Sequence, residues 1–254
     1  MLRHDDTTGL PLLLHLNSEP WMNLDAYATQ SAEVPFPICT PAEDCLMLPM
    51  PARLSVDHGS PVARTIGQRR SCRAFDERPL SLPVLSLLLD LCYGTRGLAI
   101  LPNGNRVLRR PLPSAGALYP LELVVCLTRV EGAPDGVYRY EPLHHRLEPR
   151  GPLPPPDELA SMLLAQPYVT HANLLVFLVG GLDRTMAKYG MRGYRYLLLE
   201  AGHAAQNLCL VATEAGLGTL CIGGFRDTLL NRWLGLDTRH SVALYAVAVG
   251  WLPV

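Results

Sequence analysis

The run YRYLLLEAGHAAQNLCLVATEA occupies residues 194–215 and contains no proline. Its apolar residues recur at helical spacing, at Leu197, Ala201, Ala204, Leu208, Val211 and Ala215. This spacing predicts a long helix that buries one face in the core of the protein. Gly202 lies among the alanines at 201, 204 and 205, and such small residues allow another helix to approach closely, within the chain or from a second subunit.

The rest of the chain predicts a mixture of helices and strands around this helix. A capped helix follows Ser81, with Pro83 in its first turn and Gly94 at its end. Two more helices are expected over residues 157–166 and, capped by Asp227, over 228–234. Strands are expected over residues 121–128, 136–141, 146–149, 174–179 and 242–249. These elements do not alternate as βαβ units, so the predicted class is α+β, with an antiparallel-rich sheet flanked by helices.

Composition limits what kind of protein this is. The chain has 254 residues, 48% of them apolar and 18% charged, which is enough apolar material for a full hydrophobic core. Lys and Arg number 22 against 23 Asp and Glu, so no overall basic field exists to bind nucleic acid or an anionic membrane. The apolar runs are far shorter than the roughly 20 residues of a membrane-spanning helix, and no signal-peptide pattern is present. We therefore expect a cytoplasmic protein that binds neither nucleic acid nor a membrane.

The N-terminal region and the cysteines carry two further predictions. Five prolines between residues 33 and 51 predict an extended arm over residues 1–60, followed by one domain over residues 61–254. The seven cysteines form no Cys-x-x-Cys pair and are odd in number, which favours neither a disulfide framework nor a zinc site. Most of them are expected to be small buried residues, and no metal is expected.

The segment RRSCRAF, at residues 69–75, is the best candidate for an anion site. Three guanidinium groups, those of Arg69, Arg70 and Arg73, and the Ser71 hydroxyl fall within five residues. Guanidinium forks match the geometry of a phosphate, and the hydroxyl adds another donor. The alternative is a solvated basic turn, which the apolar Phe75 disfavours because it indicates a packed segment.

Two runs of small residues are candidates for contact with a flat ligand. The run PSAG, at residues 113–116, precedes the predicted strand at 121, and GLGTLCIGG fills residues 216–224. Small residues let a backbone approach a ligand closely. For the first run, an ordinary turn before a strand is the alternative. The second run lacks the G-x-G-x-x-G spacing after a strand, so a Rossmann dinucleotide site is not supported.

Taken together, these motifs resemble a known family. In chain order they are Arg-Arg-Ser-x-Arg-x-Phe, Pro-Ser-Ala-Gly-x-x-Tyr-Pro-Leu-Glu, Lys-Tyr-Gly, Gly-His-x-Ala-Gln-Asn-Leu, and Gly-Leu-Gly-Thr followed by Ile-Gly-Gly-Phe. This order is similar to that of the SagB-type, thiazoline- or oxazoline-oxidase-like dehydrogenases of the nitroreductase fold, over residues 61–252. The chain departs from the family at one point. Members often carry a basic residue after the last glycine, where this chain has Trp251 after Gly250.

The resemblance implies an α+β homodimer that holds FMN at its subunit interface. The residues implied to hold the FMN phosphate and ribityl chain are Arg69, Arg70, Ser71 and Arg73. Those implied to lie against the isoalloxazine, from the other subunit, are Pro113, Ser114, Ala115 and Gly116. Those implied to pass near the reactive edge of the flavin are Gly218, Thr219, Ile222 and Gly223.

Lys188 and Tyr189 match the Lys-Tyr pair that azoline-oxidising members of the family use for proton abstraction. Conversion of a thiazoline or oxazoline to an azole removes a proton from one ring carbon and a hydride equivalent from its neighbour, and flavin N5 takes the hydride. A lysine desolvated beside a flavin can have its pKa lowered toward neutrality and act as the base, with a tyrosine hydroxyl assisting. The alternative is a solvated lysine beside a packed tyrosine.

The expected function is thus the flavin-dependent dehydrogenation of an azoline or another small amino-acid-derived substrate. That substrate is free or attached to a peptide or carrier. A biosynthetic enzyme is a further possible partner of the protein. The alternatives are an NAD(P)H-dependent reductase of nitroaromatics or quinones, and a flavin-fold docking subunit without turnover. On the long helix, His203 is expected to be a hydrogen-bonded core or interface residue, whereas the sequence leaves open whether Gln206 and Asn207 reach the flavin.

Overall fold

The computed structural model describes residues 60–253 except 101, 103, 165 and 166. Apart from residue 60, the proline-rich arm predicted over residues 1–60 lies outside the described residues, as do Cys39 and Cys45. No helix in the described part of the chain combines the length and the apolar character needed to cross a bilayer.

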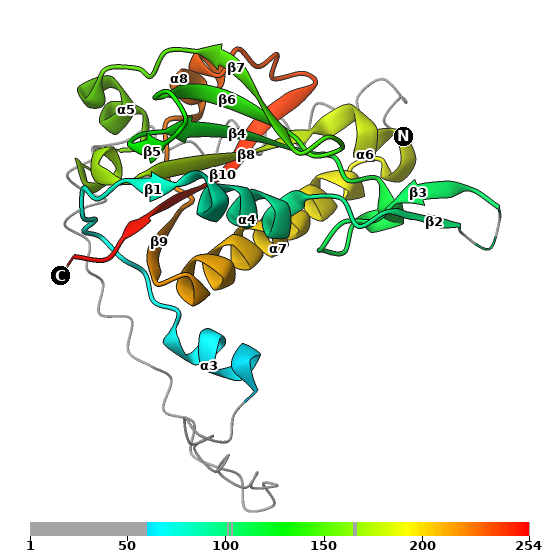
Figure 1. Cartoon of the computed structure of the whole chain (residues 1–254). Coiled ribbons are helices and arrows are strands. Elements are labelled where there is room, and N and C mark those ends of the chain that lie inside the picture. The colour runs from blue at the N-terminus through cyan, green and yellow to red at the C-terminus, as the bar shows by residue number, and fades with distance from the viewer. Residues whose placement is uncertain (1–59, 101, 103, 165–166, 254) are drawn as a thin grey trace, which may run out of the picture.

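A six-stranded antiparallel sheet forms the centre of the fold (Figure 1). Its strands lie in the order β7-β6-β4-β8-β10-β9. Their bounds are β4 Leu121–Leu127, β6 Gly136–Glu141, β7 Arg146–Gly151, β8 Leu174–Gly181, β9 Leu217–Ile222 and β10 Ser241–Trp251. Every neighbouring pair is antiparallel, which confirms the predicted class and all five predicted strands. Strand β9 was not predicted, because Gly216 just before it and Gly218 within it made the run resemble a loop.

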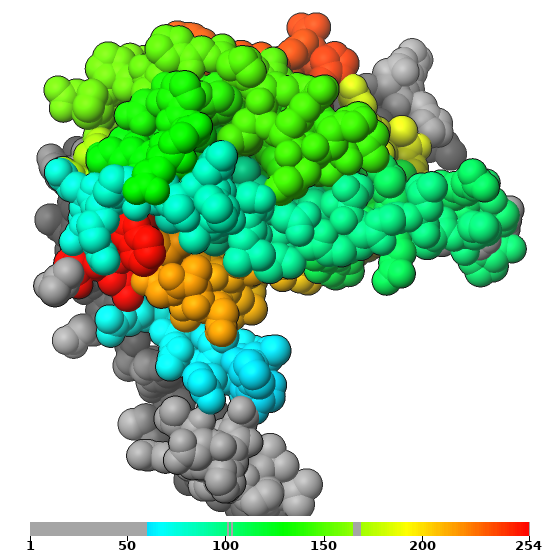
Figure 2. Space-filling view, viewed as in Figure 1, coloured from blue at the N-terminus to red at the C-terminus, as the bar shows by residue number. Residues whose placement is uncertain are grey.

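Helices and short strands surround this sheet. The helices are α3 Pro61–Gln68, α4 Leu82–Tyr93, α5 Pro156–Met162, α6 Leu182–Tyr189, α7 Arg192–Glu214 and α8 Asp227–Trp233, with 3-10 turns η2 Ala115–Ala117 and η3 Pro167–His171. The short strands are β1 Leu80–Ser81, parallel to β5 Val130–Glu131, and β2 Leu98–Ile100, antiparallel to β3 Arg106–Leu108. The β2–β3 hairpin projects from the body of the protein in both overall views (Figures 1 and 2) and exposes Leu98 and Ile100.

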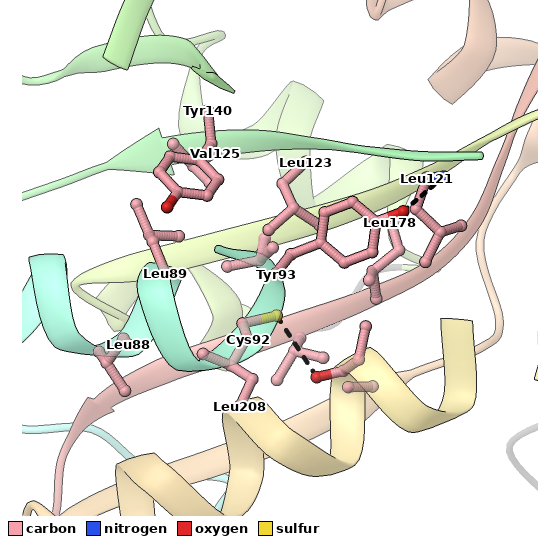
Figure 3. Packing of buried hydrophobic residues seen from close by; sticks show 14 of the residues in the cluster. Leu88, Leu89, Cys92, Tyr93, Leu121, Leu123, Val125, Tyr140, Leu178 and Leu208 are labelled. Atoms are coloured by element: carbon pink, nitrogen blue, oxygen red, sulfur yellow. Dashed lines mark hydrogen bonds between the residues drawn. The ribbon is translucent and has the colours of Figure 1, made fainter. Parts of the chain in front are cut away.

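The sheet is buried on both faces. On β8, alternate residues belong to different clusters: Val176 and Leu178 face a core shared with α4 and α7, whereas Phe177 and Val179 face a second core that includes Leu230 of α8. Figure 3 shows the first of these cores, where Leu89 and Tyr93 of α4 pack against strand residues such as Leu123. Burial of both faces explains why the strand reads as a continuous apolar run instead of an alternating one.

Three details of the predicted elements are wrong. The helix predicted over 157–166 ends at Met162, because Leu164 adopts φ +57 and leaves the helical region. Asp227 lies inside the first turn of α8 and does not cap it, since Arg226 holds the capping position. Strand β7 ends at Gly151, two residues beyond the predicted end at Pro149, and an edge strand tolerates this proline because one side of its backbone has no partner strand.

Candidate functional site

The long helix α7 separates the predicted site residues into two groups. Arg69 directly follows α3, which packs near the C-terminal end of α7 through a hydrogen bond from the Thr65 hydroxyl to Glu214. Lys188 and Tyr189 end α6, just before the N-terminus of α7. Because α7 has 23 residues, its two ends lie about 33 Å apart along its axis.

At the C-terminal end, residues 69–73 lie alongside β9. Ser71 forms a parallel bridge with Thr219, and the Cys72 N–H donates to the Thr219 carbonyl over 2.8 Å. Arg70 lines a cavity of about 410 Å³ together with Gly216 and Gly218. We call Arg69, Arg70, Ser71, Arg73 and Gly218 the arginine corner. Within the described residues none of its three arginines forms a salt bridge, in contrast to paired surface arginines such as Arg96.

Most of the predicted 218–223 stretch is built into the sheet. A Cβ at Gly218 would lie 2.8 Å from the Cys72 Sγ, so this glycine lets β9 pack closely on residues 69–73. Thr219 and Ile222 are 2% exposed, whereas Gly223 is exposed. Any contact of Thr219 or Ile222 with a ligand would therefore come from the backbone. The predicted role of this stretch beside a flavin stays a prediction.

At the N-terminal end of α7, the structure brings together two motifs that are about 70 residues apart in the sequence. Gly116 adopts φ +62, and a Cβ at this position would lie 2.5 Å from both the Lys188 Nζ and the Tyr189 Oη. The predicted flavin-contacting run and the predicted catalytic pair are therefore in direct contact. We call Gly116, Lys188, Tyr189 and their surroundings the lysine cleft. It contains a cavity of about 550 Å³ whose basic lining residues are Arg106, Arg110, Arg184 and Lys188.

The buried carboxylate of Glu200 holds the 113–116 run of this cleft in place. The Ser114 hydroxyl donates to Glu200 Oε2 over 2.5 Å, and the Tyr93 hydroxyl donates to Glu200 Oε1 over 2.9 Å. Each hydroxyl is itself oriented by a backbone N–H, that of Tyr119 for Ser114 and that of Leu121 for Tyr93, as Figure 3 shows for the second. Glu200 is thus the point at which α4, α7 and the 113–116 run are joined.

Burial controls the protonation of this carboxylate. Glu200 is 3% exposed, and burial raises its pKa above the ordinary value, although the hydrogen bonds from Ser114 and Tyr93 and the charges of Arg110 and Arg184 act in the opposite direction. The pKa of Tyr93 is raised as well, first by burial and then by the charge of Glu200. The guanidinium of Arg110 lies 4.4 Å from the centre of the Tyr93 ring.

The sequence did not predict Glu200, Tyr93, Arg110 or Arg184 as site residues. The available signal was a carboxylate placed on the apolar stripe of a helix, between Leu197 and Ala201. A charged residue at such a position is rarely buried without a partner.

The environment of the Lys-Tyr pair differs in part from expectation. Lys188 is exposed in the single chain, so the expected desolvation of its side chain is not provided by this chain alone. Tyr189 is half-buried and packs edge-on against Tyr196, with ring centres 5.0 Å apart. Gly190, with φ +56, ends α6 immediately after the pair, and the absence of a side chain at Gly193 lets α7 begin close against α6.

Three polar residues of α7, His203, Gln206 and Asn207, occupy different environments. His203 is exposed, so the core position considered for it is wrong, while an interface position stays a prediction. Gln206 is exposed as well. Asn207 donates to the carbonyls of Leu91 and Pro111 and so holds the local backbone, and whether it also contacts a flavin stays a prediction.

Trp251, where the sequence departs from the family pattern, is tied into the fold. It forms an antiparallel bridge with Asp76, and its indole N–H donates to the Pro79 carbonyl over 3.0 Å. The Arg78 guanidinium stacks on its ring at 4.7 Å but is also paired with Asp76. The chain thus places a basic group beside this position from a different part of the sequence.

The residues present fit a flavin phosphate and a flat ring in two separate places. The arginine corner supplies guanidinium groups without acidic partners among the described residues, beside a cavity. The lysine cleft supplies a glycine that leaves Lys188 and Tyr189 uncovered, beside a second cavity. The two places lie toward opposite ends of α7.

Comparison with other proteins agrees with this architecture. The sequence pattern of the Nitroreductase family matches residues 66–251. The chain is 38% identical over 170 residues to a candidate nitroreductase, MJ1384 of Methanocaldococcus jannaschii, covering 66% of this chain and 80% of that protein. It is 33% identical over 179 residues to the microcin B17-processing protein McbC of Escherichia coli, covering 66% of this chain but only 61% of McbC.

A solved structure shows the same fold over nearly the whole chain. A chain of the E. coli microcin synthetase McbBCD complex with truncated pro-MccB17 bound superposes with a TM-score of 0.69 and 24% identity, covering 99% of this chain and 95% of that one. The family match and the identity to MJ1384 and McbC support an oxidoreductase. From its sequence and its fold, the chain belongs to the nitroreductase family.

Proposed function

We propose that this protein is an FMN-dependent dehydrogenase of the SagB type. Its substrate would be an azoline or another small amino-acid-derived compound, free or attached to a peptide or carrier. The family membership and the similarity to McbC, a microcin-processing protein, support this proposal. The observation that carries it is the contact between Gly116 and both Lys188 and Tyr189, which joins a ligand-contacting run to a proton-transfer pair.

The arginine corner would bind the phosphate and ribityl chain of FMN. Arg70 lines the cavity there, and Arg69, Ser71 and Arg73 lie in the same short segment. Guanidinium groups without acidic partners among the described residues are suited to a phosphate dianion. When bound, FMN supplies a hydride acceptor at N5 of its ring.

The lysine cleft would carry out the proton chemistry. The neutral Lys188 amine would remove the proton from the substrate carbon and become an ammonium, and the Tyr189 hydroxyl would orient the amine and assist the transfer. The Glu200 network would hold Ser114, and with it the start of the 113–116 run, at a fixed distance from this pair. Covering the exposed Lys188 by substrate, cofactor and a second subunit would then exclude water from the cleft.

Two copies of the chain would form each site. The arginine corner and the lysine cleft lie toward opposite ends of α7 in each copy, and in the proposed dimer the arginine corner of one copy would face the lysine cleft of another. The solvent-facing side of α7, which carries Leu198, Leu199 and Gly202, offers an apolar surface with a small residue for such a contact. The proposed protein is therefore a homodimer.

The charge of the lysine cleft limits the substrate. Arg106, Arg184 and Lys188 line its cavity, and none of them forms a salt bridge with an acidic side chain in the described part of the chain. Such a lining favours substrates that bring carboxylate or several carbonyl oxygens next to the reacting carbon. An amino-acid-derived ring attached to a peptide meets this condition.

The first experiment tests cofactor and class together. The purified full chain is expected to be yellow or to take up added FMN with quenching of the flavin fluorescence. A colourless preparation that fails to bind FMN would favour a docking subunit without turnover.

The second experiment separates the dehydrogenase from an NAD(P)H-dependent nitro or quinone reductase. The Lys188→Ala variant is expected to keep bound FMN and to retain any reduction of a quinone by NADPH. It is expected to lose azoline oxidation by roughly 100-fold or more, the usual contribution of a positioned base. An unchanged azoline oxidation rate would overturn the role of Lys188, and robust NADPH-dependent reduction without any azoline oxidation in the wild type would favour the reductase.

A further inference from the structure

Two thiols meet between α7 and β9, outside the proposed proton-transfer machinery. The Sγ atoms of Cys209, on α7, and Cys221, on β9, lie 3.5 Å apart. Cys209 is 1% exposed, whereas Cys221 is partly exposed. The thiols of Cys72 and Cys92, in contrast, contact backbone carbonyls and are buried. Among the cysteines that the structure describes, only the 209–221 pair brings two sulfur atoms together.

The surroundings make the two thiols unequal. The hydrogen bond from Cys209, and then those of Tyr245 and the charge of Arg69, hold the pKa of Cys221 below the ordinary thiol value despite its burial. The same hydrogen bond and burial raise the pKa of Cys209. Cys221 is thus both the more accessible and the more acidic thiol, and the thiolate is the form that reacts with oxidants.

We propose that Cys221 and Cys209 form an oxidisable dithiol, which hydrogen peroxide converts to an intramolecular disulfide joining β9 to α7. The Cys221 thiolate attacks one peroxide oxygen, so that an S–O bond forms, the O–O bond breaks and hydroxide leaves as water after taking a proton. The Cys209 thiol then attacks the Cys221 sulfur, an S–S bond forms and the sulfenic oxygen leaves as a second water. Two thiols are oxidised by two electrons in total, and one peroxide is reduced to two waters.

The geometry permits this step with little rearrangement. A disulfide needs sulfur atoms about 2.05 Å apart, so the two Sγ atoms must approach by about 1.5 Å. Rotation about the side-chain bonds of Cys209 and Cys221 can supply a movement of this size. The proposal does not depend on the proposed reaction, because the thiols are present whether or not a flavin is bound.

The sequence offers a direct readout. Tryptic cleavage after Arg195 and Arg226 releases one peptide, residues 196–226, that contains both cysteines and no others. Glu214 lies between them, so cleavage with an endoproteinase specific for glutamate places Cys209 and Cys221 on separate fragments unless a disulfide joins them. Cleavage after Glu200 removes residues 196–200 in either case. The purified full chain is treated with hydrogen peroxide, its remaining thiols are alkylated, and the peptides are analysed by mass spectrometry with and without dithiothreitol.

The expected result is that peptide 196–226 escapes alkylation, is lighter by two hydrogen atoms and stays linked after cleavage at Glu214. Dithiothreitol should reverse all three changes, and loss of alkylation should be at least about tenfold faster than for the buried Cys126. The Cys126→Ser variant should behave as the wild type. Cys209→Ser should instead leave Cys221 as a sulfenic or sulfinic acid in an otherwise folded protein, checked by circular dichroism.

Three outcomes in the wild type would overturn the proposal, and none of them depends on a variant that folds poorly. In the first, both cysteines of peptide 196–226 remain alkylated after peroxide. In the second, Cys221 is oxidised to sulfinic acid while Cys209 stays alkylated. In the third, Cys221 is found linked to the peptide that contains Cys39 and Cys45. Loss or retention of FMN binding, measured on the same samples, tests the proposed function separately.

Discussion

The two ends of α7 are built in opposite ways. At its C-terminal end, the arginine corner is a short local segment that lies beside β9 through backbone bonds and leaves its guanidinium groups unpaired within the described residues. At its N-terminal end, the lysine cleft is assembled from α4, the 113–116 run, α6 and α7, and its support is a buried hydrogen-bond network around Glu200. One end is arranged to receive a ligand by charge, the other to hold reacting groups in position.

This contrast teaches where each kind of change should act. A change at the arginine corner should weaken cofactor binding and leave the geometry of the cleft intact. A change at the lysine cleft should reduce turnover and leave cofactor binding largely intact.

Gly116→Ala should reduce turnover by about 100-fold, because the new Cβ would lie 2.5 Å from the Lys188 Nζ and the Tyr189 Oη and displace both groups. Gly97→Ala is the matched control, since Gly97 also has a positive φ but no atom within 4 Å of its added Cβ. Both variants should lose about 1 kcal/mol of unfolding free energy in urea. Equal turnover in the two variants would contradict the assignment of Gly116 to the cleft.

Arg70→Ala should raise the dissociation constant for FMN by about 10- to 100-fold, the effect of losing one or more charge-assisted hydrogen bonds to phosphate. Titration of flavin fluorescence measures this change. Arg232→Ala, on α8 and outside the lining of the cavity beside Arg70, is the control and should bind FMN as the wild type does. An FMN affinity lowered equally by both changes would point to a general electrostatic effect instead of a site at the arginine corner.

Mixing two inactive variants tests whether each active site combines the arginine corner of one copy with the lysine cleft of the other. Lys188→Ala and the double variant Arg70→Ala, Arg73→Ala should each be inactive at low FMN concentration. After co-expression, half of the dimers combine one chain of each kind and hold one intact site of two, so the mixture should recover about a quarter of the wild-type activity. Size-exclusion chromatography checks that dimers form. No recovery in mixed dimers would show that one chain supplies both ends of a site.

The smallest effect is expected for the pH dependence of stability in Glu200→Gln. Burial raises the pKa of Glu200 above its ordinary value of 4.5, so the folded chain binds this proton more tightly than the unfolded chain. Its contribution is therefore complete below pH 4.5 and is lost as the pH rises through the raised pKa.

Urea unfolding at several pH values should accordingly show the wild type losing on the order of 1 kcal/mol relative to Glu200→Gln as the pH rises from 4.5 toward neutrality. Glu131→Gln, at an exposed position on β5, is the control for a generic change of charge. A difference between wild type and Glu200→Gln that is independent of pH would contradict the raised pKa.

Much of the fold was predictable because its signals are local. The spacing of Leu197, Ala204 and Leu208 predicts α7, and the apolar run of β8 predicts a buried strand, because each pattern depends only on which faces are covered. Strand β9 was missed because Gly216 and Gly218 suggest a turn, although Gly218 is needed for the close approach of Cys72. Tertiary packing here overrides local preference.

The sequence motifs of the candidate site could be predicted, but the hydrogen-bond network around Glu200 that holds them could not. Arg69 to Arg73 and the Lys188–Tyr189 pair are contiguous and could be read directly. That Tyr93 and Ser114 would converge on Glu200 depends on how three distant segments pack, and no spacing in the sequence encodes it. Only the unusual carboxylate on the apolar stripe of α7 gave a hint of such a network.

The position of β10 also bears on how the protein is made. This strand is the last element that the structure describes along the chain, yet it lies inside the sheet, between β8 and β9. During synthesis, β9 emerges from the ribosome before the strand that attaches it to the rest of the sheet. Strand β9 and one edge of β8 therefore remain unpaired until residues 241–251 have been synthesised. Unpaired strand edges expose the nascent chain to aggregation during this time.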